Sequence, residues 1–99
     1  MRPAQHHNFI KSPADLADCL RAGPFTSIGS YRVYLWTNEG EIVSFNGARE
    51  AFKSECRKIL DKESGRIEFC DIYWEGPEYR CAITGEPCPS NYGDPNEPD

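Results

Sequence analysis

YRVYLWTNEGEIVSF, residues 31–45, predicts a β-hairpin. Its first half divides with a period of two into the two faces of a strand. One face carries Tyr31, Val33, Leu35 and Thr37, and the other carries Arg32, Tyr34, Trp36 and Asn38. Turn-forming residues follow at Asn38, Glu39 and Gly40, so the segment EIVSF is expected to return as the second strand.

A helix is predicted on each side of this hairpin. Before it, Ser12 is a suitable N-cap and Pro13 a suitable first residue for a helix over residues 13–22. The apolar stripe of this first helix is Leu16, Cys19 and Leu20. After the hairpin, Asn46 can cap an amphipathic helix over residues 48–62. Its predicted buried stripe is Phe52, Cys56, Ile59 and Leu60.

The second half of the chain predicts another hairpin. RIEFCDIYW, residues 66–74, reads as a strand, and after a turn the segment YRCAIT, residues 79–84, is expected to pair back. The predicted order is therefore α-β-β-α-β-β. We expect an α+β fold of two layers, with a four-stranded antiparallel sheet, the amphipathic helix on one face and a short N-terminal helix.

Length and composition indicate one small domain. The chain has 99 residues, of which 12% are aromatic, and this is enough for a single core. We divide it into a polar leader (1–11), a single α+β domain (12–92) and a disordered acidic tail (93–99). No apolar run is long enough to cross a bilayer, and the first residues lack the order of a signal peptide. We therefore expect a cytoplasmic protein with no membrane partner.

The net charge of −5 is concentrated at the C-terminal end of the chain. Residues 1–74 hold equal numbers of basic and acidic residues, whereas residues 75–99 hold one basic residue, Arg80. The acids there are Glu75, Glu78, Glu86, Asp94, Glu97 and Asp99. Such a surface repels nucleic acid and attracts basic proteins, including those that bind nucleic acid. The simpler interpretation is that these charges keep the domain in solution.

Cysteine usage favours reduced thiols. The five cysteines are odd in number and lack the spacing of a secreted disulfide scaffold. Cys19 and Cys56 fall on the apolar stripes of the predicted helices, where a free cysteine packs as a small hydrophobe. Both are expected in the core.

Cys81 and Cys88 lie in the segment CAITGEPCPSNYG, on either side of a Thr-Gly turn. A structural zinc site normally has four Cys or His ligands, and here Thr84 stands where a C-x-x-C pair would have its second thiolate. The chain's two histidines lie next to each other in the leader. We expect no metal, with Cys81 and Cys88 as weak candidate ligands. A disulfide between them is geometrically easier, but a plain turn with free thiols is favoured.

No catalytic motif is found in the sequence. A cysteine nucleophile needs a histidine base within hydrogen-bond reach, and both histidines are in the leader. The G-x-S-x-G, phosphate-loop and H-E-x-x-H motifs are also absent from the sequence. We expect a protein without enzymatic activity and without a cofactor.

One face of the first strand could form an aromatic platform. If helix 48–62 covers the other face, Tyr34 and Trp36 lie exposed and can contact proteins or stack on bases. Base stacking needs surrounding positive charge, and the acidic end of the chain argues against it. Alternatively, helix 13–22 covers these aromatic residues as a second core layer.

The stretch WEGPEYRCAITGEPCPSNYG resembles a set of small, mostly uncharacterised bacterial proteins common on plasmids and integrative elements. The shared pattern comprises Gly29-Ser30-Tyr31, Ser44-Phe45, Arg49, Trp74-Glu75-Gly76-Pro77, Cys81, Thr84-Gly85 and Ser90-Asn91-Tyr92-Gly93. Cys88 departs from the pattern, which has an aliphatic residue there. The resemblance implies no known activity. Its mobile-element setting implies counter-defence or element maintenance, and the size and charge are similar to those of anti-CRISPR proteins.

From these features we expect a non-enzymatic inhibitor that binds a basic, nucleic-acid-binding surface of a defence complex. Its charges are expected at Glu75, Glu78, Glu86 and Asp94, and its anchors at Tyr79, Trp36 and Tyr34. Two alternatives stay open. One is a small thiol or zinc module built on Cys81 and Cys88, and the other is a single-strand nucleic-acid binder that uses the aromatic platform.

Overall fold

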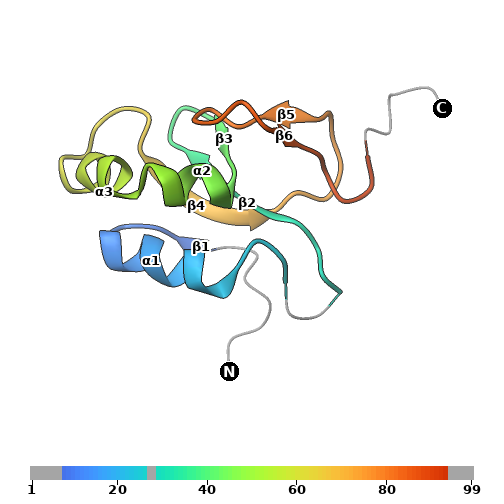
Figure 1. Ribbon diagram of the computed structural model, residues 1–99, viewed down its shortest axis with the longest axis horizontal. Helices are drawn as coiled ribbons and strands as arrows, with labels where there is room; N and C mark the ends of the chain where they lie inside the picture. The colour runs from blue at the N-terminus through green and yellow to red at the C-terminus, as the bar shows by residue number, and fades with distance from the viewer. Residues whose placement is uncertain (1–7, 27–28, 94–99) are drawn as a thin grey trace.

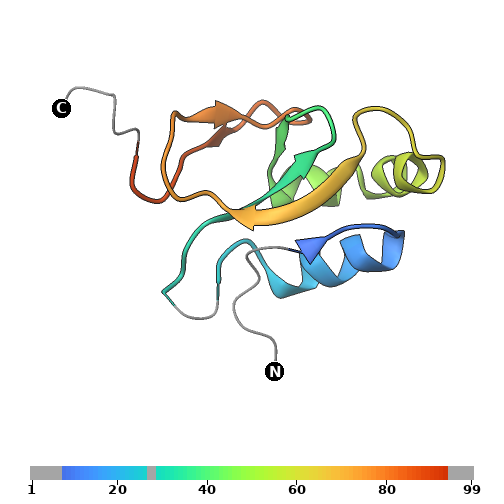
Figure 2. The same ribbon diagram turned by 180° about the vertical axis from the view of Figure 1, so that it is seen from behind.

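The computed structural model describes residues 8–26 and 29–93. In chain order its elements are β1 (Asn8–Phe9), α1 (Pro13–Ala22), β2 (Val33–Thr37), β3 (Ile42–Val43), α2 (Phe45–Glu50), α3 (Phe52–Leu60), β4 (Ile67–Ile72), β5 (Tyr79–Arg80) and β6 (Pro87–Cys88). Figures 1 and 2 view the molecule from opposite sides and show α1, α2 and α3 together on one side of the main sheet. The predicted acidic tail beyond residue 93 and the first seven residues of the predicted leader lie outside the described residues.

The main sheet has the strand order β1-β4-β2-β3, and β5 and β6 form a separate two-stranded sheet, the C-terminal ribbon. The prediction of an α+β fold with antiparallel strands is confirmed, but the prediction of one sheet built from two consecutive hairpins is wrong. Both edges of β4 are occupied, by β1 and by β2. The chain therefore leaves the sheet after β4, and β5 pairs with β6 across a turn at Gly85, where φ is +78°.

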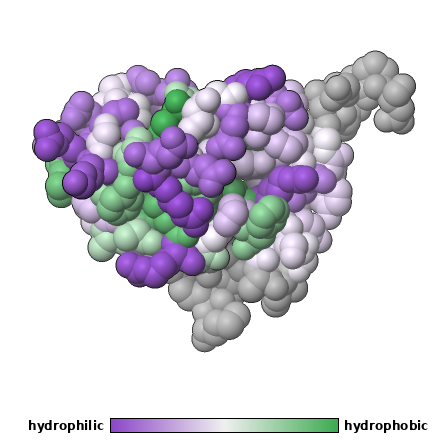
Figure 3. Space-filling model, in the orientation of Figure 1, coloured by the Kyte–Doolittle hydropathy of each residue, from purple (hydrophilic) through white to green (hydrophobic). Residues whose placement is uncertain are grey.

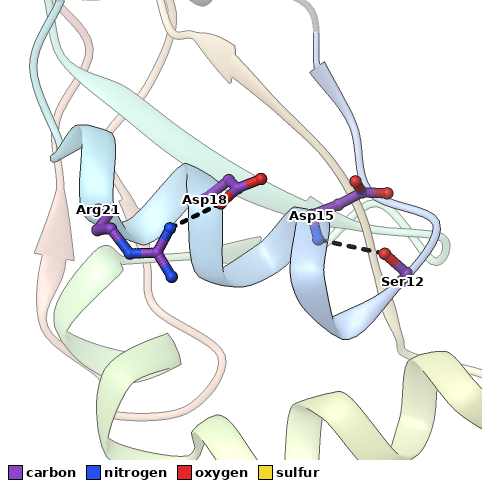
Figure 4. Close-up of polar contacts among 4 residues, drawn as sticks. All are labelled: Ser12, Asp15, Asp18 and Arg21. Carbon is purple, nitrogen blue, oxygen red and sulfur yellow. Dashed lines mark hydrogen bonds and ion pairs between the residues drawn. The ribbon is translucent and has the colours of Figure 1, made fainter.

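Helix α1 forms as its sequence predicts. Ser12 is the N-cap, and its Oγ accepts a hydrogen bond from the Asp15 backbone N–H at 3.2 Å (Figure 4). Asp18 and Arg21 form an exposed ion pair at 2.8 Å, which contributes little to stability. The buried residues of α1 are Leu16, Cys19 and Leu20. Packing against α2, α3 and Cys70 of the sheet is what holds the helix in place.

The predicted helix over residues 48–62 is two shorter helices, α2 and α3, separated at Ala51. Helix α2 is capped by Ser44, whose Oγ accepts a hydrogen bond from the Gly47 N–H at 3.0 Å. Asn46, the predicted cap, is an exposed residue inside α2. No helix in the described part of the chain is long and apolar enough to cross a membrane.

Helix α3 packs most of its predicted apolar stripe against the core, together with an acidic side chain that was not predicted. Its buried residues are Glu55 and Ile59, and Phe52 and Cys56 are half-buried. The prediction that Leu60 belongs to the core is wrong, because this side chain is 68% exposed. The buried Glu55 carboxylate pairs with Lys58 at 3.3 Å.

One face of the main sheet packs against the helices. Leu35 and Cys70 are paired across β2 and β4, and Cys70 is hydrogen-bonded to Cys19 of α1, which together with burial raises the pKa of Cys19. An irregularity between Trp36 and Thr37 makes Glu68 an extra residue of β4. This bulge turns residues on both sides of it to the same face. Ile67, Cys70 and Ile72 are therefore all buried.

The opposite face of the sheet carries Tyr34, Trp36 and Phe69. The helices lie together on one side of the sheet (Figures 1 and 2), and Cys19 of α1 contacts Cys70, the strand partner of Leu35. The alternative in which helix 13–22 covers the aromatic residues of the other face is therefore wrong. The C-terminal ribbon covers part of this face instead, since the Tyr34 hydroxyl donates a hydrogen bond to the Pro89 carbonyl at 2.8 Å.

Candidate interaction surface

Among the described residues, five aromatic rings lie in successive contact on the sheet face away from the helices, and we call them the aromatic row. In order they are Phe9, Phe69, Trp36, Tyr73 and Tyr79, with ring-centroid distances of 6.3, 6.4, 5.6 and 5.8 Å. Strand pairing places both Phe9 and Trp36 beside Phe69. The ends of the row are open to solvent, because Phe9 is 60% and Tyr79 is 46% exposed.

The two predicted strand anchors differ in accessibility. Trp36 is half-buried in the middle of the aromatic row, so its outer edge can contact a partner. Tyr34 is buried under the C-terminal ribbon, and its hydroxyl is held by the Pro89 carbonyl. Burial, helped by the neighbouring Cys88, raises the pKa of Tyr34 to about 12. Tyr34 therefore helps to hold the C-terminal ribbon against the sheet through this hydrogen bond.

The predicted acidic residues occupy three different situations. Glu75 and Glu78 are exposed on the segment that leads into β5 and Tyr79. Glu86 is half-buried and accepts a hydrogen bond from the Ser44 hydroxyl. Asp94 lies outside the described residues. Glu78 thus lies directly before Tyr79 at the end of the aromatic row, and Glu75 lies three residues earlier in the chain.

A second aromatic cluster was not predicted from the sequence. The rings of Tyr31 and Trp74 meet edge to face at 4.6 Å, and those of Trp74 and Tyr92 stack at 6.1 Å. Nearby, the Asn91 side chain accepts a hydrogen bond from the Arg32 N–H at 2.6 Å and donates one to the Tyr73 carbonyl at 2.7 Å. These hydrogen bonds hold the end of the described chain against the residue before β2 and the residue after β4.

Cys81 lies against the N-terminal end of α2, a contact that sequence reasoning missed. Its Sγ accepts hydrogen bonds from the backbone N–H groups of Ser44, Ile83 and Thr84, at 3.3, 3.4 and 3.5 Å. The Ser44 Oγ is 3.4 Å from the same sulfur. One signal for this contact was present in the sequence. Gly47 lies between the predicted cap Asn46 and the predicted helix, and a glycine at a helix often has a packing reason, such as the close approach of another segment.

These hydrogen bonds change the acidity of the Cys81 thiol. Burial, the largest single effect, raises its pKa, but the hydrogen bonds from Ser44 and Thr84 together outweigh burial and lower the pKa to about 7. Ser44 has one hydroxyl hydrogen, so at any moment it donates either to Cys81 or to Glu86. In Cys88, burial and the neighbouring Cys81 raise the pKa to about 11.

The cysteines of the described chain are all free thiols. Residues 8–26 and 29–93 contain no group of three or more His, Cys, Asp or Glu side chains placed to hold a metal ion. Cys81 and Cys88 are both buried on the inner face of the C-terminal ribbon. Their surroundings in the structure are those of packing residues at the joint between the ribbon and α2.

Comparison with known proteins gives no relative: the chain matches no protein-family model, and no curated protein or solved structure is significantly similar to it. Its function is therefore inferred from the aromatic row and the charges beside it.

Proposed function

We propose that this protein binds a basic surface of another protein through the Tyr79 end of the aromatic row. The observation that carries this proposal is the position of Tyr79. Its ring is 46% exposed, stacks on Tyr73 and directly follows the exposed carboxylate of Glu78. An aromatic ring supplies area to bury on binding, and a neighbouring carboxylate supplies attraction for Lys and Arg side chains.

The helix side of the molecule offers a less continuous surface. In Figure 3, which shows that side, hydrophilic side chains lie between the apolar ones. The aromatic row, in contrast, is an unbroken chain of ring contacts with carboxylates at one end. Tyr73 is buried between Trp36 and Tyr79, so the row is exposed mainly at its two ends, and exposed aromatic rings beside polar residues are typical of a protein-binding site.

Electrostatics favours a protein partner over nucleic acid. Glu75 and Glu78 are exposed, and neither forms an ion pair within the described residues. Two basic residues of this part of the chain, Arg32 and Arg80, donate hydrogen bonds to backbone carbonyl groups. Nucleic-acid binding depends on clustered positive charge, whereas this chain has a net charge of −5.

The resemblance to proteins of plasmids and integrative elements supports an inhibitory role. A protein that occupies a basic groove competes with nucleic acid for the same positive charges. We therefore infer that the partner is a basic, nucleic-acid-binding protein or complex of a bacterial defence system, inhibited by occupation of its binding surface and without catalysis. This is the manner of action expected of an anti-CRISPR-type protein.

Capture from a bacterial extract tests this proposal, with the tagged wild type, the Tyr79→Ala variant and a matched Tyr92→Ala control. Tyr92 is an exposed aromatic residue outside the row. We expect the wild type and the control to capture a nucleic-acid-binding protein, and Tyr79→Ala to retain about tenfold less. Added nucleic acid should release the captured protein.

Two results would contradict the proposal. One is that Tyr79→Ala captures as much protein as the wild type, which would show that the aromatic row is not part of the binding surface. The other is a captured protein that keeps its nucleic acid while bound. A gel shift of single-stranded DNA by the purified wild type would instead favour the nucleic-acid-binding alternative.

A further inference from the structure

A pocket of about 230 Å³ opens where the segment after α1, the start of β2, the N-terminal end of α2 and the C-terminal ribbon meet. Much of its wall is apolar and includes Phe25, Val33 and Phe45. Two charged side chains, Arg32 and Glu86, also line it. Pockets for drug-sized ligands measure roughly 300–1,000 Å³, so this pocket suits a smaller molecule.

The two charges in the pocket are not paired with one another. Within the described residues, neither Arg32 nor Glu86 takes part in an ion pair. The Arg32 guanidinium donates one hydrogen bond, to the Ser90 carbonyl at 3.1 Å, and the Glu86 carboxylate accepts one from the Ser44 hydroxyl. Both side chains are half-buried, so each has lost part of its hydration and would be stabilised by a ligand group of opposite charge.

Tyr34, which also lines the pocket, lies close enough to sense both charges. Burial is the main cause of its raised pKa, while Arg32 acts to lower this pKa and Glu86 to raise it. Electrostatic interactions weaken with distance. Arg32, Glu86 and Tyr34 all line the same pocket.

We propose that this pocket binds a small zwitterion, a free α-amino acid with an apolar side chain. Its ammonium group pairs with Glu86, its carboxylate pairs with Arg32, and its side chain packs against the apolar wall. A simple cation would be repelled by Arg32, and a simple anion would be repelled by Glu86. An uncharged ligand would desolvate both charges and pair neither. The zwitterion is the ligand class that satisfies both charges and the apolar wall.

A series of leucine derivatives tests this proposal on the unmodified protein, with NMR shifts of pocket residues as the readout. Leucine carries both charges, N-acetyl-leucine lacks the ammonium group and leucine amide lacks the carboxylate. We expect leucine to shift the signals of Phe25, Val33 and Glu86, and each derivative to bind about tenfold more weakly or not at all. No shift with leucine or phenylalanine, or equal binding of either derivative, would overturn the proposal.

Two variants test the assignment of the ammonium partner. Glu86→Gln keeps an acceptor for the Ser44 hydroxyl but removes the charge, and we expect it to weaken leucine binding by about tenfold. Glu63→Gln removes an exposed carboxylate that does not line the pocket, and we expect no change. Unchanged leucine binding by a folded Glu86→Gln variant would refute the assignment. If this variant does not fold, the derivative series on the wild type decides. Because leucine binding is measured without any protein partner, its failure leaves the proposed function separately testable.

Discussion

A Cβ atom added to Gly47 would lie 2.8 Å from the Sγ of Cys81. This distance is shorter than side-chain atoms tolerate, so the sulfur occupies space that any larger residue at position 47 would need. Glycine inside a helix is less stable than alanine by about 1 kcal/mol. The close packing of the C-terminal ribbon on α2 explains why a glycine stands there.

A double-mutant cycle tests this contact. We expect Gly47→Ala to destabilise the protein by about 1–3 kcal/mol, because the new methyl group displaces Cys81. In a Cys81→Ala background the same substitution should be much less harmful, since the sulfur is gone and alanine favours the helix. Chemical denaturation gives the four free energies of unfolding. An equal effect of Gly47→Ala in both backgrounds would show that the contact does not matter.

Ser44 and Asn46 provide a matched pair for the cap of α2. Ser44→Ala should destabilise the fold by about 0.5–2 kcal/mol, because its Oγ accepts the Gly47 N–H and bonds with Glu86. Asn46→Ala should change stability little, since Asn46 is exposed within the helix. Thermal melts of the two variants decide. A larger loss of stability in Asn46→Ala than in Ser44→Ala would show that Asn46 is the cap.

Ile59 and Leu60 are neighbours in α3 with opposite exposure. Ile59 is 5% exposed and Leu60 is 68% exposed. We expect Ile59→Ala to lower the free energy of unfolding by about 2–5 kcal/mol, as large-to-small changes in a core do. Leu60→Ala should change it by no more than about 0.5 kcal/mol. Equal losses in the two variants would show that Leu60 is buried, as its place on the predicted apolar stripe indicates.

The Cys81 thiol should make stability depend on pH in a defined direction. Its pKa in the folded protein is about 7, below the ordinary value of 9.0, so folding favours the thiolate. This contribution is present in full above about pH 9 and is lost as the pH falls through about 7. The difference in unfolding free energy between the wild type and Cys81→Ala should therefore grow from pH 7 to pH 9. A constant difference over this range would contradict the lowered pKa.

Local patterns were sufficient to predict the first hairpin and α1. Side chains of residues 31–38 alternate between two faces, and the turn follows directly in the sequence. The cap of α1 is equally local, because Ser12 accepts its hydrogen bond from Asp15, three residues later. The Asn8–Phe9 strand was not predicted, because two residues are too few to show a period. Its place in the sheet depends on the open edge of β4.

The candidate surface was predicted in part, and its missing pieces are long-range contacts. Alternation along β2 places Trp36 on the same face as Tyr34, but it does not determine which face the helices cover, so that question was left open. Tyr34 shares the face but is buried through a hydrogen bond to Pro89, 55 positions away in the sequence. Ser44 and Cys81 are separated by 37 positions. Neither contact has a local pattern, since each depends on where the ribbon packs.

Charge reversal at Glu75 and Glu78 examines the binding surface without disturbing the fold. Both carboxylates are exposed, so replacing them with lysine should leave the melting temperature nearly unchanged. Glu86 is kept, because its bond to Ser44 joins the ribbon to α2. A matched control, Glu50→Lys with Glu63→Lys, makes the same change of net charge at exposed positions at the end of α2 and after α3.

The most direct test of the proposed function is the association rate constant of these variants with the captured partner at two ionic strengths. At low salt we predict that Glu75→Lys with Glu78→Lys slows association by about tenfold, while the control variant associates at nearly the wild-type rate. The difference should shrink as salt screens the charges. An unchanged rate at low salt, or equal slowing by the control, would contradict recognition of a basic partner through this surface.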